Sequence, residues 1–296
     1  MSPDSLRRLT EGWGQAVAER RANEAAQASA PVEVGESPRT RRVAEVAPIA
    51  TQASVSSDGA MVRLRNEGWK EVKVVAVSEV TVQSSGARAV EAARPSRRAA
   101  DPLVTLSRHS YQAWLGEADA FAPYQYAEGL RRGLDHCAHV TSTNDGAPWI
   151  ERITRLNFPA APQIIDWSHA TGHVWLVAHE VYGEQTPAAQ RWADTQLDAL
   201  WRGQAADLVQ ELERLPLAQT ASAPDYFRTR QNQMQYDQFR AKGWPIGSGV
   251  VESAANTVVH HRLKRPGRGW KREYAQAMLA ALCELHSHRF EQAWPA

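Results

Sequence analysis

Residues 247–265 read GSGVVESAANTVVHHRLKR, and this stretch is the most informative part of the chain. Ser248 lies between two glycines, a pattern typical of a break in the chain followed by a helix that the serine caps. Glu252 falls in the first turn of that helix, where a negative charge is favoured. Six basic residues follow before position 273 with no acidic residue among them: Arg262, Lys264, Arg265, Arg268, Lys271 and Arg272. A carboxylate at the start of a strongly basic helix suits a metal-dependent enzyme that acts on the phosphate backbone of nucleic acid.

The same helix has an apolar face. At about 100° per residue, this face carries Val251, Ala254, Ala255, Val258 and Val259. Glu252 lies at its border, in line with Asn256, which we take as an auxiliary site residue. We therefore expect the helix to be buried against a sheet, with Glu252 at the edge of that sheet. The alternative is that Glu252 is an ordinary capping acid of the first turn.

Composition permits a core and excludes several classes of protein. The chain has 296 residues, of which 43% are hydrophobic. Its net charge is only +1, so a nucleic-acid partner is indicated by local clustering and not by overall charge. Cys137 and Cys283 lie far apart, which argues against a disulfide framework or a zinc ribbon. No apolar run reaches the roughly 18 residues of a membrane span, and no signal peptide is recognisable. We therefore expect a soluble cytoplasmic protein with no membrane partner.

Alternating apolar residues predict strands in the first half of the chain. Residues 61–80 alternate around a turn at 66–68, which predicts an antiparallel pair. A third strand is expected at 81–83 or slightly beyond, and the charged, proline-bearing residues 87–101 are typical of a loop. A helix is predicted at 108–136 with Tyr111, Leu115, Phe121, Tyr124, Leu130 and Leu134 as its core positions.

Short strands are predicted at 139–142 and 163–165, and each leads to an aspartate, Asp145 or Asp166. The chain divides into four predicted regions. Residues 1–53 form a peripheral region with a helix at 5–29 and a flexible linker. An α/β core follows in two parts, 54–172 and 241–296, separated by an all-helical insertion at 173–240. The insertion is expected to pack around Trp175, Trp192 and Trp201. The final helices are predicted at 248–265 and 271–290.

Asp58 and Asp145 share a local pattern, because each is followed by glycine and alanine. A neighbouring glycine lets the backbone turn tightly and lets a bulky substrate approach the carboxylate. Three carboxylates at one edge of a sheet can hold two Mg²⁺ or Mn²⁺ ions about 3.5–4 Å apart, since these ions prefer oxygen ligands. One ion activates a water or a 3′-hydroxyl, and the other stabilises the leaving oxygen at phosphorus.

The order of these motifs resembles the RNase H-like core of DDE transposases from bacterial insertion sequences. Residues 58–62 (DGAMV) with 67–73 (EGWKEVK) are similar to the first-acid hairpin of the ISKra-type, Mutator-like group. Residues 145–150 (DGAPWI) resemble its second-acid motif, and residues 247–254, with the basic residues and Trp270, resemble its glutamate helix. The resemblance covers residues 54–292. It implies an RNase H-like mixed sheet flanked by helices, with an all-helical insertion before the helix that bears the glutamate.

By this resemblance, Asp58, Asp145 and Glu252 form a catalytic, metal-binding triad. The implied activity is cleavage at transposon ends and strand transfer into target DNA. Related Mutator-like transposases carry a Cys-x-x-His element where this chain has Asp166 and His169, so Asp166 is a rival for the second acid, ranked below Asp145. His169 is interpreted as an auxiliary residue that orients other groups or contacts DNA, with a purely structural role as the alternative.

The resemblance also implies a homo-oligomer on paired DNA ends and a nucleoid-associated location. Family members usually have a longer N-terminal DNA-binding region, so residues 1–53 are interpreted as a remnant of that region in a truncated chain.

The basic segment has two interpretations. In the first, Arg262, Lys264, Arg265, Arg268, Lys271 and Arg272 contact phosphates, and Trp270 stacks on an unpaired base. In the second, the basic residues are a solvated helix face and Trp270 packs in the core. Two alternatives to the transposase also stand: a catalytically silent DNA-binding remnant, and an RNase H-like nuclease without strand transfer.

Overall fold

The computed structural model describes residues 2–30, 49, 51–83, 101–265, 267 and 269–293 of the chain. The predicted linker at 31–48, most of the predicted loop at 87–101 and the basic residue Arg268 lie outside this description. None of the described helices is both long and apolar enough to cross a lipid bilayer.

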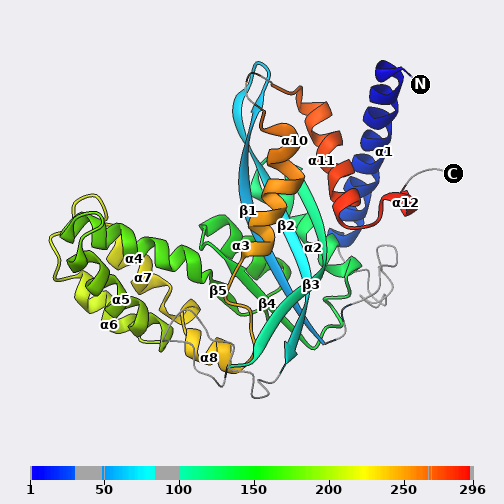
Figure 1. The fold of residues 1–296 in the computed structure, drawn as a ribbon. Coiled ribbons are helices and arrows are strands. Elements are labelled where there is room, and N and C mark those ends of the chain that lie inside the picture. The colour runs from blue at the N-terminus through cyan, green and yellow to red at the C-terminus, as the bar shows by residue number, and fades with distance from the viewer. Residues whose placement is uncertain are drawn as a thin grey trace.

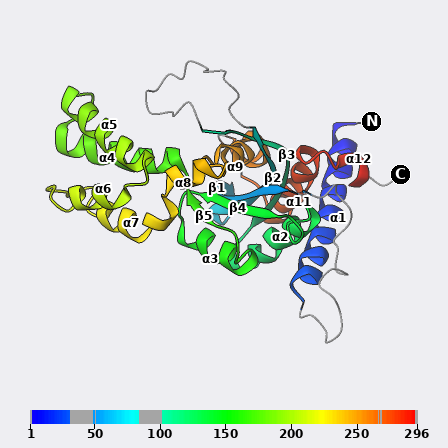
Figure 2. The same cartoon turned by 90° about the horizontal axis from the view of Figure 1, so that it is seen from below.

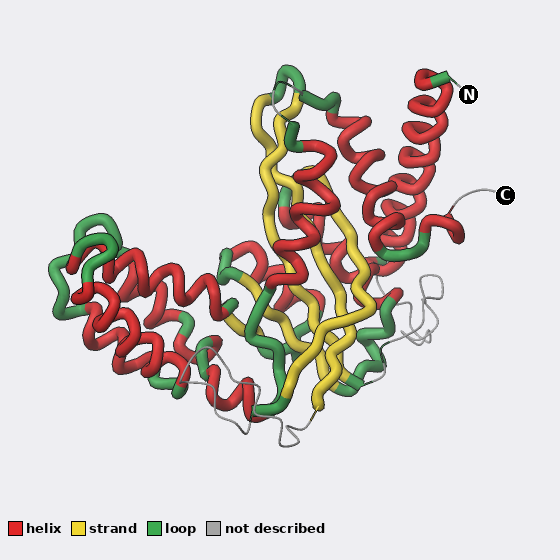
Figure 3. Tube along the Cα trace, viewed as in Figure 1, coloured by secondary structure: helices red, strands yellow, loops and turns green. Residues whose placement is uncertain are grey.

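A five-stranded mixed sheet with the order β3-β2-β1-β4-β5 forms the centre of the molecule (Figure 1). Its strands are β1 (Gln52–Leu64), β2 (Gly68–Gln83), β3 (Leu103–Leu115), β4 (His139–Asn144) and β5 (Gln163–Ile165). β2 is antiparallel to both β1 and β3, whereas β4 is parallel to β1 and β5 is parallel to β4. Helices lie on both sides of the strands (Figure 3). A mixed sheet flanked by helices is therefore confirmed.

The first hairpin forms as predicted. The register pairs Leu64 with Gly68 and leaves residues 65–67 as the turn. Asn66 and Gly68 have φ angles of 65° and 75°, in the left-handed region that asparagine and glycine adopt most readily. Burial alternates toward the tip of the hairpin, with Ala60, Val62 and Leu64 buried and Met61 and Arg63 exposed.

The third strand departs from the prediction. β2 continues to Gln83, and the third strand is β3, so a separate strand near 81–83 and a helix beginning at 108 are both wrong. Helix α2 begins only at Ala118 and spans Ala118–Arg131. Tyr111 and Leu115 explain the error, because a spacing of four residues places two side chains on one face in a helix and in a strand. Both side chains are buried, as predicted, but they belong to a strand.

Two layers of helix cover the sheet. One face packs against the glutamate-bearing segment and α11 (Arg272–His286), and the other packs against α2 and α3 (Pro148–Asn157). The helix predicted at 248–265 is in fact three consecutive pieces: α9 (Gly249–Ala254), the π-helix η3 (Ala255–His260) and α10 (His261–Leu263). The π-turn preserves the predicted apolar face, and the five residues of that face are all buried. The helix predicted at 271–290 is α11, which ends earlier and is followed by α12 (Phe290–Ala293).

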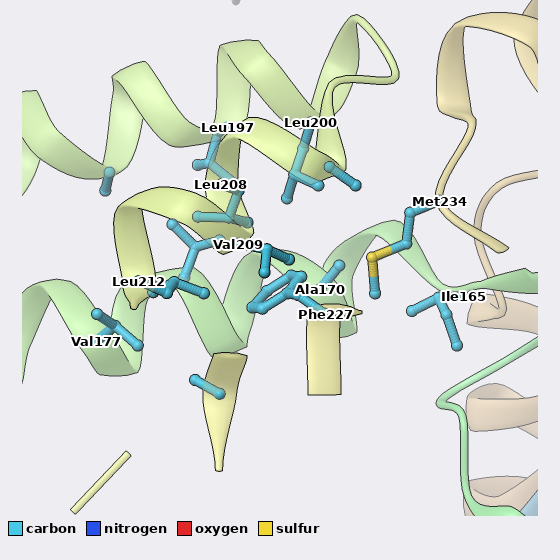
Figure 4. Packing of buried hydrophobic residues seen from close by; sticks show 14 of the residues in the cluster. Ile165, Ala170, Val177, Leu197, Leu200, Leu208, Val209, Leu212, Phe227 and Met234 are labelled. Atoms are coloured by element: carbon cyan, nitrogen blue, oxygen red, sulfur yellow. The ribbon is translucent and has the colours of Figure 1, made fainter. Parts of the chain in front are cut away.

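An all-helical lobe lies beside the sheet (Figure 1). It contains α4 (Trp167–Tyr182), α5 (Pro187–Trp201), α6 (Ala205–Leu212), α7 (Ala223–Thr229), η2 (Gln231–Gln233) and α8 (Tyr236–Ala241). Phe227 lies inside its core, and Met234 lies beside Ile165 at the end of β5, so the lobe and the sheet share one apolar cluster (Figure 4). The predicted core tryptophans Trp175 and Trp192 pack against this cluster as partly buried residues. Helix α4 runs through the predicted boundary at 172/173.

Helix α1 (Pro3–Ser29) forms as predicted, but it is not peripheral, because it packs along α11 and α2 (Figure 2). Charged side chains are buried in this interface. Arg21, only 6% exposed, donates to Glu284 Oε1 at 2.9 Å. Arg289 donates to Glu128 Oε1 at 2.8 Å and also pairs with Glu284, while Arg131 pairs with Glu128. A buried charge network therefore joins α1, α2 and the C-terminal helices.

Candidate active site

The three predicted acids come from separate segments and lie near one another. Asp58 is in β1, Asp145 directly follows β4, and Glu252 is in the first turn of α9. Burial raises the pKa of the Asp58 carboxyl to about 6. The negative charges of Asp145 and Glu252 contribute to this rise, and an N–H from Gly59 opposes it. Because charges raise a neighbour's pKa appreciably only at short range, Asp145 and Glu252 each lie close to Asp58, and we call these three carboxylates the acidic cluster.

A fourth acid, which we did not predict, lies beside this cluster. Glu71 on β2 extends across Gly59, where an added Cβ would lie 1.9 Å from Glu71 Oε1. Glu71 pairs with Lys73, which is 5% exposed and lies 4.6 Å from the ring centroid of Trp149. Gly59 therefore provides the space for an ion pair next to Asp58. The alternation of residues 69–80 placed Glu71 on the strand but gave no sign of this contact.

The raised pKa of Asp58 predicts a stability gain when its charge is removed. A carboxyl whose folded pKa lies near 6 opposes folding once it ionises, so the folded state loses stability as pH rises from about 4 through 6. In metal-free protein at pH 7.5, Asp58→Asn should therefore raise the free energy of unfolding by about 1–3 kcal/mol. Urea denaturation in EDTA at pH 7.5 and pH 4 measures this gain, which should shrink at the lower pH. An equal gain at both values would show that charge is not its cause.

The turn after β4 fixes Asp145. Its Oδ1 accepts the N–H of Ala147 at 2.8 Å, and Gly146 has a φ of 86°. Arg230, from the helical lobe, donates to the Gly146 carbonyl at 3.0 Å, and an added Cβ at Gly146 would lie 2.9 Å from Arg230 Nε. The Tyr226 hydroxyl lies 3.5 Å from the carbonyl oxygen of Asp145. The lobe therefore shapes the second-acid loop, a role that the sequence did not indicate.

Glu252 is exposed in the first turn of α9, and Ser248 occupies the N-cap position. The predicted side-chain cap is not made. Ser248 Oγ donates instead toward Glu252 Oε1 at 3.4 Å. The serine hydroxyl therefore faces the glutamate carboxylate and not a backbone N–H of the helix.

Asn144 holds the first two acid-bearing segments together. The backbone pairing of β1 with β4 ends at Ser54 and Thr141. Beyond that point, Asn144 Oδ1 accepts the N–H of Ser57 at 2.7 Å, and its Nδ2 donates to Ser142 Oγ at 2.6 Å. Asn144 is 5% exposed. Its side-chain hydrogen bond to Ser57 therefore takes the place, inside the protein, of the backbone hydrogen bonds that β1 and β4 no longer form there. Asn144, the residue before Asp145, is thereby joined to Ser57, the residue before Asp58.

Asp166, the rival second acid, has a different environment. It is 2% exposed and caps α4, with Oδ1 accepting the N–H of His169 at 2.7 Å. Its Oδ2 accepts the N–H of Ser248 at 2.6 Å. Both carboxylate oxygens are thus engaged by backbone, and Asp166 attaches β5 to the loop that precedes Glu252. This environment suits a positioning residue.

The position of Asn144 predicts that its removal loosens the two acid-bearing segments and weakens any binding of a divalent cation by the acidic cluster. Asn144→Ala leaves the buried N–H of Ser57 without its acceptor, which lowers the free energy of unfolding by about 1–3 kcal/mol. It also removes the hydrogen bond that joins the segment of Asp58 to the segment of Asp145. The Mg²⁺ concentration required for half-maximal thermal stabilisation should rise. The control is Thr186→Ala, since Thr186 also accepts a backbone N–H with its side chain, that of Ala189, but lies in the helical lobe at the start of α5. Equal Mg²⁺ dependence in the two variants would contradict this role.

The donor set of the acidic cluster fits a hard divalent cation. Its ligands are carboxylate oxygens, which Mg²⁺ and Mn²⁺ prefer, and their mutual repulsion is relieved by a cation. Among the described residues, no three His, Cys, Asp or Glu side chains are arranged closely enough to hold an ion as they stand. The cluster is therefore a concentration of negative charge that does not hold three ligands in position for one ion.

The predicted basic residues occupy two environments. Arg262, Lys264 and Arg265 are exposed at the end of the glutamate-bearing segment, and Lys264 and Arg265 have no acidic partner in the described part of the chain. Arg272 instead pairs with Glu67 at 2.6 Å and joins α11 to the hairpin turn. Lys271 is exposed and lies 3.9 Å from Glu273.

Trp270 is partly buried and attaches the basic loop to β1. Its backbone N–H donates to the Arg63 carbonyl at 3.2 Å, and its backbone carbonyl accepts the N–H of Arg65 at 2.8 Å. It also packs against the apolar cluster on that face of the sheet. Arg63 and Arg65 are exposed and extend the basic surface along the hairpin.

The two auxiliary residues make local contacts. Asn256 Oδ1 lies 3.0 Å from His260 Nδ1 within η3, and His169 Nε2 lies 3.3 Å from His173 Nε2 on α4.

Comparison of the chain with protein-family models and with curated proteins gave no match.

Proposed function

We propose that this protein is a DDE transposase with an RNase H-like core, which cleaves DNA at transposon ends and joins those ends to target DNA. The observation that carries the proposal is the cluster of Asp58, Asp145 and Glu252, drawn from β1, the end of β4 and α9. The sheet order adds support, because β4 is parallel to β1 and its end, at Asn144, lies beside Ser57 in the middle of β1, next to Asp58.

In this proposal Asp58, Asp145 and Glu252 would hold two Mg²⁺ or Mn²⁺ ions through their carboxylate oxygens. When bound, the ions supply Lewis-acid activation of the attacking hydroxyl and of the phosphate. Asp58 must be ionised to bind, and its pKa of about 6 makes metal binding stronger as pH rises through that value. Asn144 and Asp166 keep the three acid-bearing segments in register before any ion binds.

DNA is the proposed partner, bound by the exposed surface formed by Arg63, Arg65, Arg262, Lys264 and Arg265. Positive side chains on this surface neutralise phosphates without reading the base sequence. Assembly of several copies on paired DNA ends belongs to the same proposal.

The function is tested with a labelled duplex that carries the repeats flanking the coding sequence. The purified chain is incubated with this duplex and a supercoiled target plasmid, with Mg²⁺ or with EDTA. Nicks at the repeat ends and plasmid-joined products that require Mg²⁺ are expected. Nicks without joined products would indicate the nuclease. DNA binding with no cleavage would indicate the silent remnant.

Neutralising Arg262, Lys264 and Arg265 together should weaken binding to every DNA sequence. The slope of log K against log salt is negative, and each lost phosphate contact reduces its magnitude by about 0.9, so the slope should become less steep by about 2–3. Fluorescence anisotropy over a salt series measures it. The control is the neutralisation of Arg191, Arg202 and Arg214, which are exposed on the helical lobe. Equal losses in the two triple variants would indicate non-specific charge effects.

A further inference from the structure

Two histidines outside the acidic cluster have closely spaced ring nitrogens. His169 and His173 are four residues apart on α4, a spacing that places them on one helix face. Their Nε2 atoms lie 3.3 Å apart, with ring planes at 71°. This separation allows one long N–H···N hydrogen bond. It also matches two ligands of one zinc ion, because two Zn–N bonds of about 2.05 Å at a tetrahedral angle place the nitrogens about 3.3 Å apart.

Neighbouring residues hold both histidines in place. The His173 ring stacks on Tyr226 with centroids 4.1 Å apart, and the Arg230 guanidinium lies 4.8 Å from the Tyr226 ring. The backbone of His169 is fixed by its hydrogen bond to Asp166. His169 is exposed and His173 is half-buried, so solvent and ions reach the pair. The two rings therefore need little rearrangement to share an ion.

The surroundings of His173 favour the neutral form of its ring. Burial, the neighbouring His169 and the positive charge of Arg230 lower the pKa of His173. A metal ligand must be neutral imidazole, and a lowered pKa favours that form.

We propose that His169 and His173 form a two-ligand site for a borderline divalent metal such as Zn²⁺, with solvent in the remaining coordination positions. The ring that carries its proton on Nε2 changes to the Nδ1–H tautomer, so that both Nε2 lone pairs face the ion. Within the described residues no third His, Cys, Asp or Glu completes the site. The proposal does not rest on the proposed transposase activity. Imidazole nitrogen suits Zn²⁺, whereas the carboxylates suit Mg²⁺, so the protein has two divalent-metal sites with different preferences.

Metal binding here would act on the scaffold of the acidic cluster. An ion held by His169 and His173 links the first two turns of α4, the helix that Asp166 caps while it holds the Ser248 loop. The ion should therefore stabilise α4 and raise the melting temperature of the protein.

The test is calorimetric titration of EDTA-stripped protein with Zn²⁺ in the presence of saturating Mg²⁺. One bound Zn²⁺ per chain is expected, together with a rise in melting temperature. His169→Ala and His173→Ala should each lose this binding, and His179→Ala, on the same helix, should keep it. His169 is exposed, so its variant tests the site without risk to the core. Electron paramagnetic resonance with Cu²⁺ should show two nitrogen ligands in the wild type.

A second variant separates this site from the acidic cluster. The triple variant Asp58→Asn, Asp145→Asn, Glu252→Gln should bind Zn²⁺ as the wild type does. Zn²⁺ binding that survives in both His169→Ala and His173→Ala, or that is lost only in the triple variant, would overturn the proposal. The outcome of the DNA-cleavage assay has no bearing on either result.

Discussion

Replacing Glu252 by glutamine is expected to abolish Mg²⁺-dependent nicking of DNA while leaving DNA affinity unchanged. The substitution preserves the size of the side chain, and α9 keeps its buried face, including Val251 and Ala254. It removes one of the negative charges that act on Asp58 and one ligand of the proposed ions. Metal-assisted stabilisation of charge is worth several kcal/mol. Because each loss of about 1.4 kcal/mol slows a reaction tenfold, nicking should fall by roughly a thousandfold.

The matched control is Glu273→Gln. Glu273 lies in the first turn of α11, as Glu252 lies in the first turn of α9, but it has no part in the acidic cluster. Nicking is followed by gel electrophoresis and binding by fluorescence anisotropy. Wild-type nicking by Glu252→Gln would remove Glu252 from the site. A parallel loss in Glu273→Gln would point to a general effect of helix N-terminal charge.

Asp166 must be separated from Asp145 by more than an activity assay. Asp166→Asn leaves only one oxygen to accept the N–H groups of His169 and Ser248, so it should weaken nicking indirectly. We expect it to keep the wild-type number of bound Mn²⁺ ions, whereas Asp145→Asn should lose ions. The number of bound Mn²⁺ ions therefore distinguishes a ligand from a positioning residue.

Local pattern predicted the elements whose periodicity is unambiguous. The hairpin of β1 and β2, the short strands β4 and β5 and the apolar face of the glutamate-bearing segment were all visible in the order of residues. The β3 strand was not, because Tyr111 and Leu115 fit both periods. What decides between helix and strand there is pairing with β2, a contact that a local window does not contain.

The candidate site shows the same division. Glycine beside an acid marks Asp58 and Asp145 in the sequence, so these positions could be proposed in advance. Asn144 and Asp166 act through partners 87 and 82 residues away. Arg230 reaches the Asp145 loop from the helical lobe. A residue whose role is to connect distant segments gives no local signal, so such roles emerge only once the fold is known.

The burial of charge between α1, α2 and the C-terminal helices gives the second large expected effect. Glu128 is fully buried, and burial raises its pKa, but Arg289 and Arg131 outweigh that effect and lower the pKa to about 2. Glu128→Gln would leave these arginines buried without their main counter-charge. Breaking such an arrangement costs about 3–5 kcal/mol, so urea denaturation at pH 7 should show a loss of that size. The control, Asp225→Asn, breaks an exposed pair with Arg228 and should cost less than about 1 kcal/mol.

The pH dependence of the wild type checks the same network without a substitution. A carboxyl whose folded pKa is lowered contributes stability above its unfolded pKa, near 4.5, and loses it as pH falls toward the folded value near 2. Wild-type stability should therefore decline steeply between pH 4.5 and 2, and the gap to Glu128→Gln should narrow over that range. A difference in the free energy of unfolding between wild type and Glu128→Gln that stays constant with pH would show that the charge of Glu128 is not what stabilises the buried arginines. Because α1 contributes Arg21 to this network, the same loss should loosen α1 from α11, and amide hydrogen exchange would detect it.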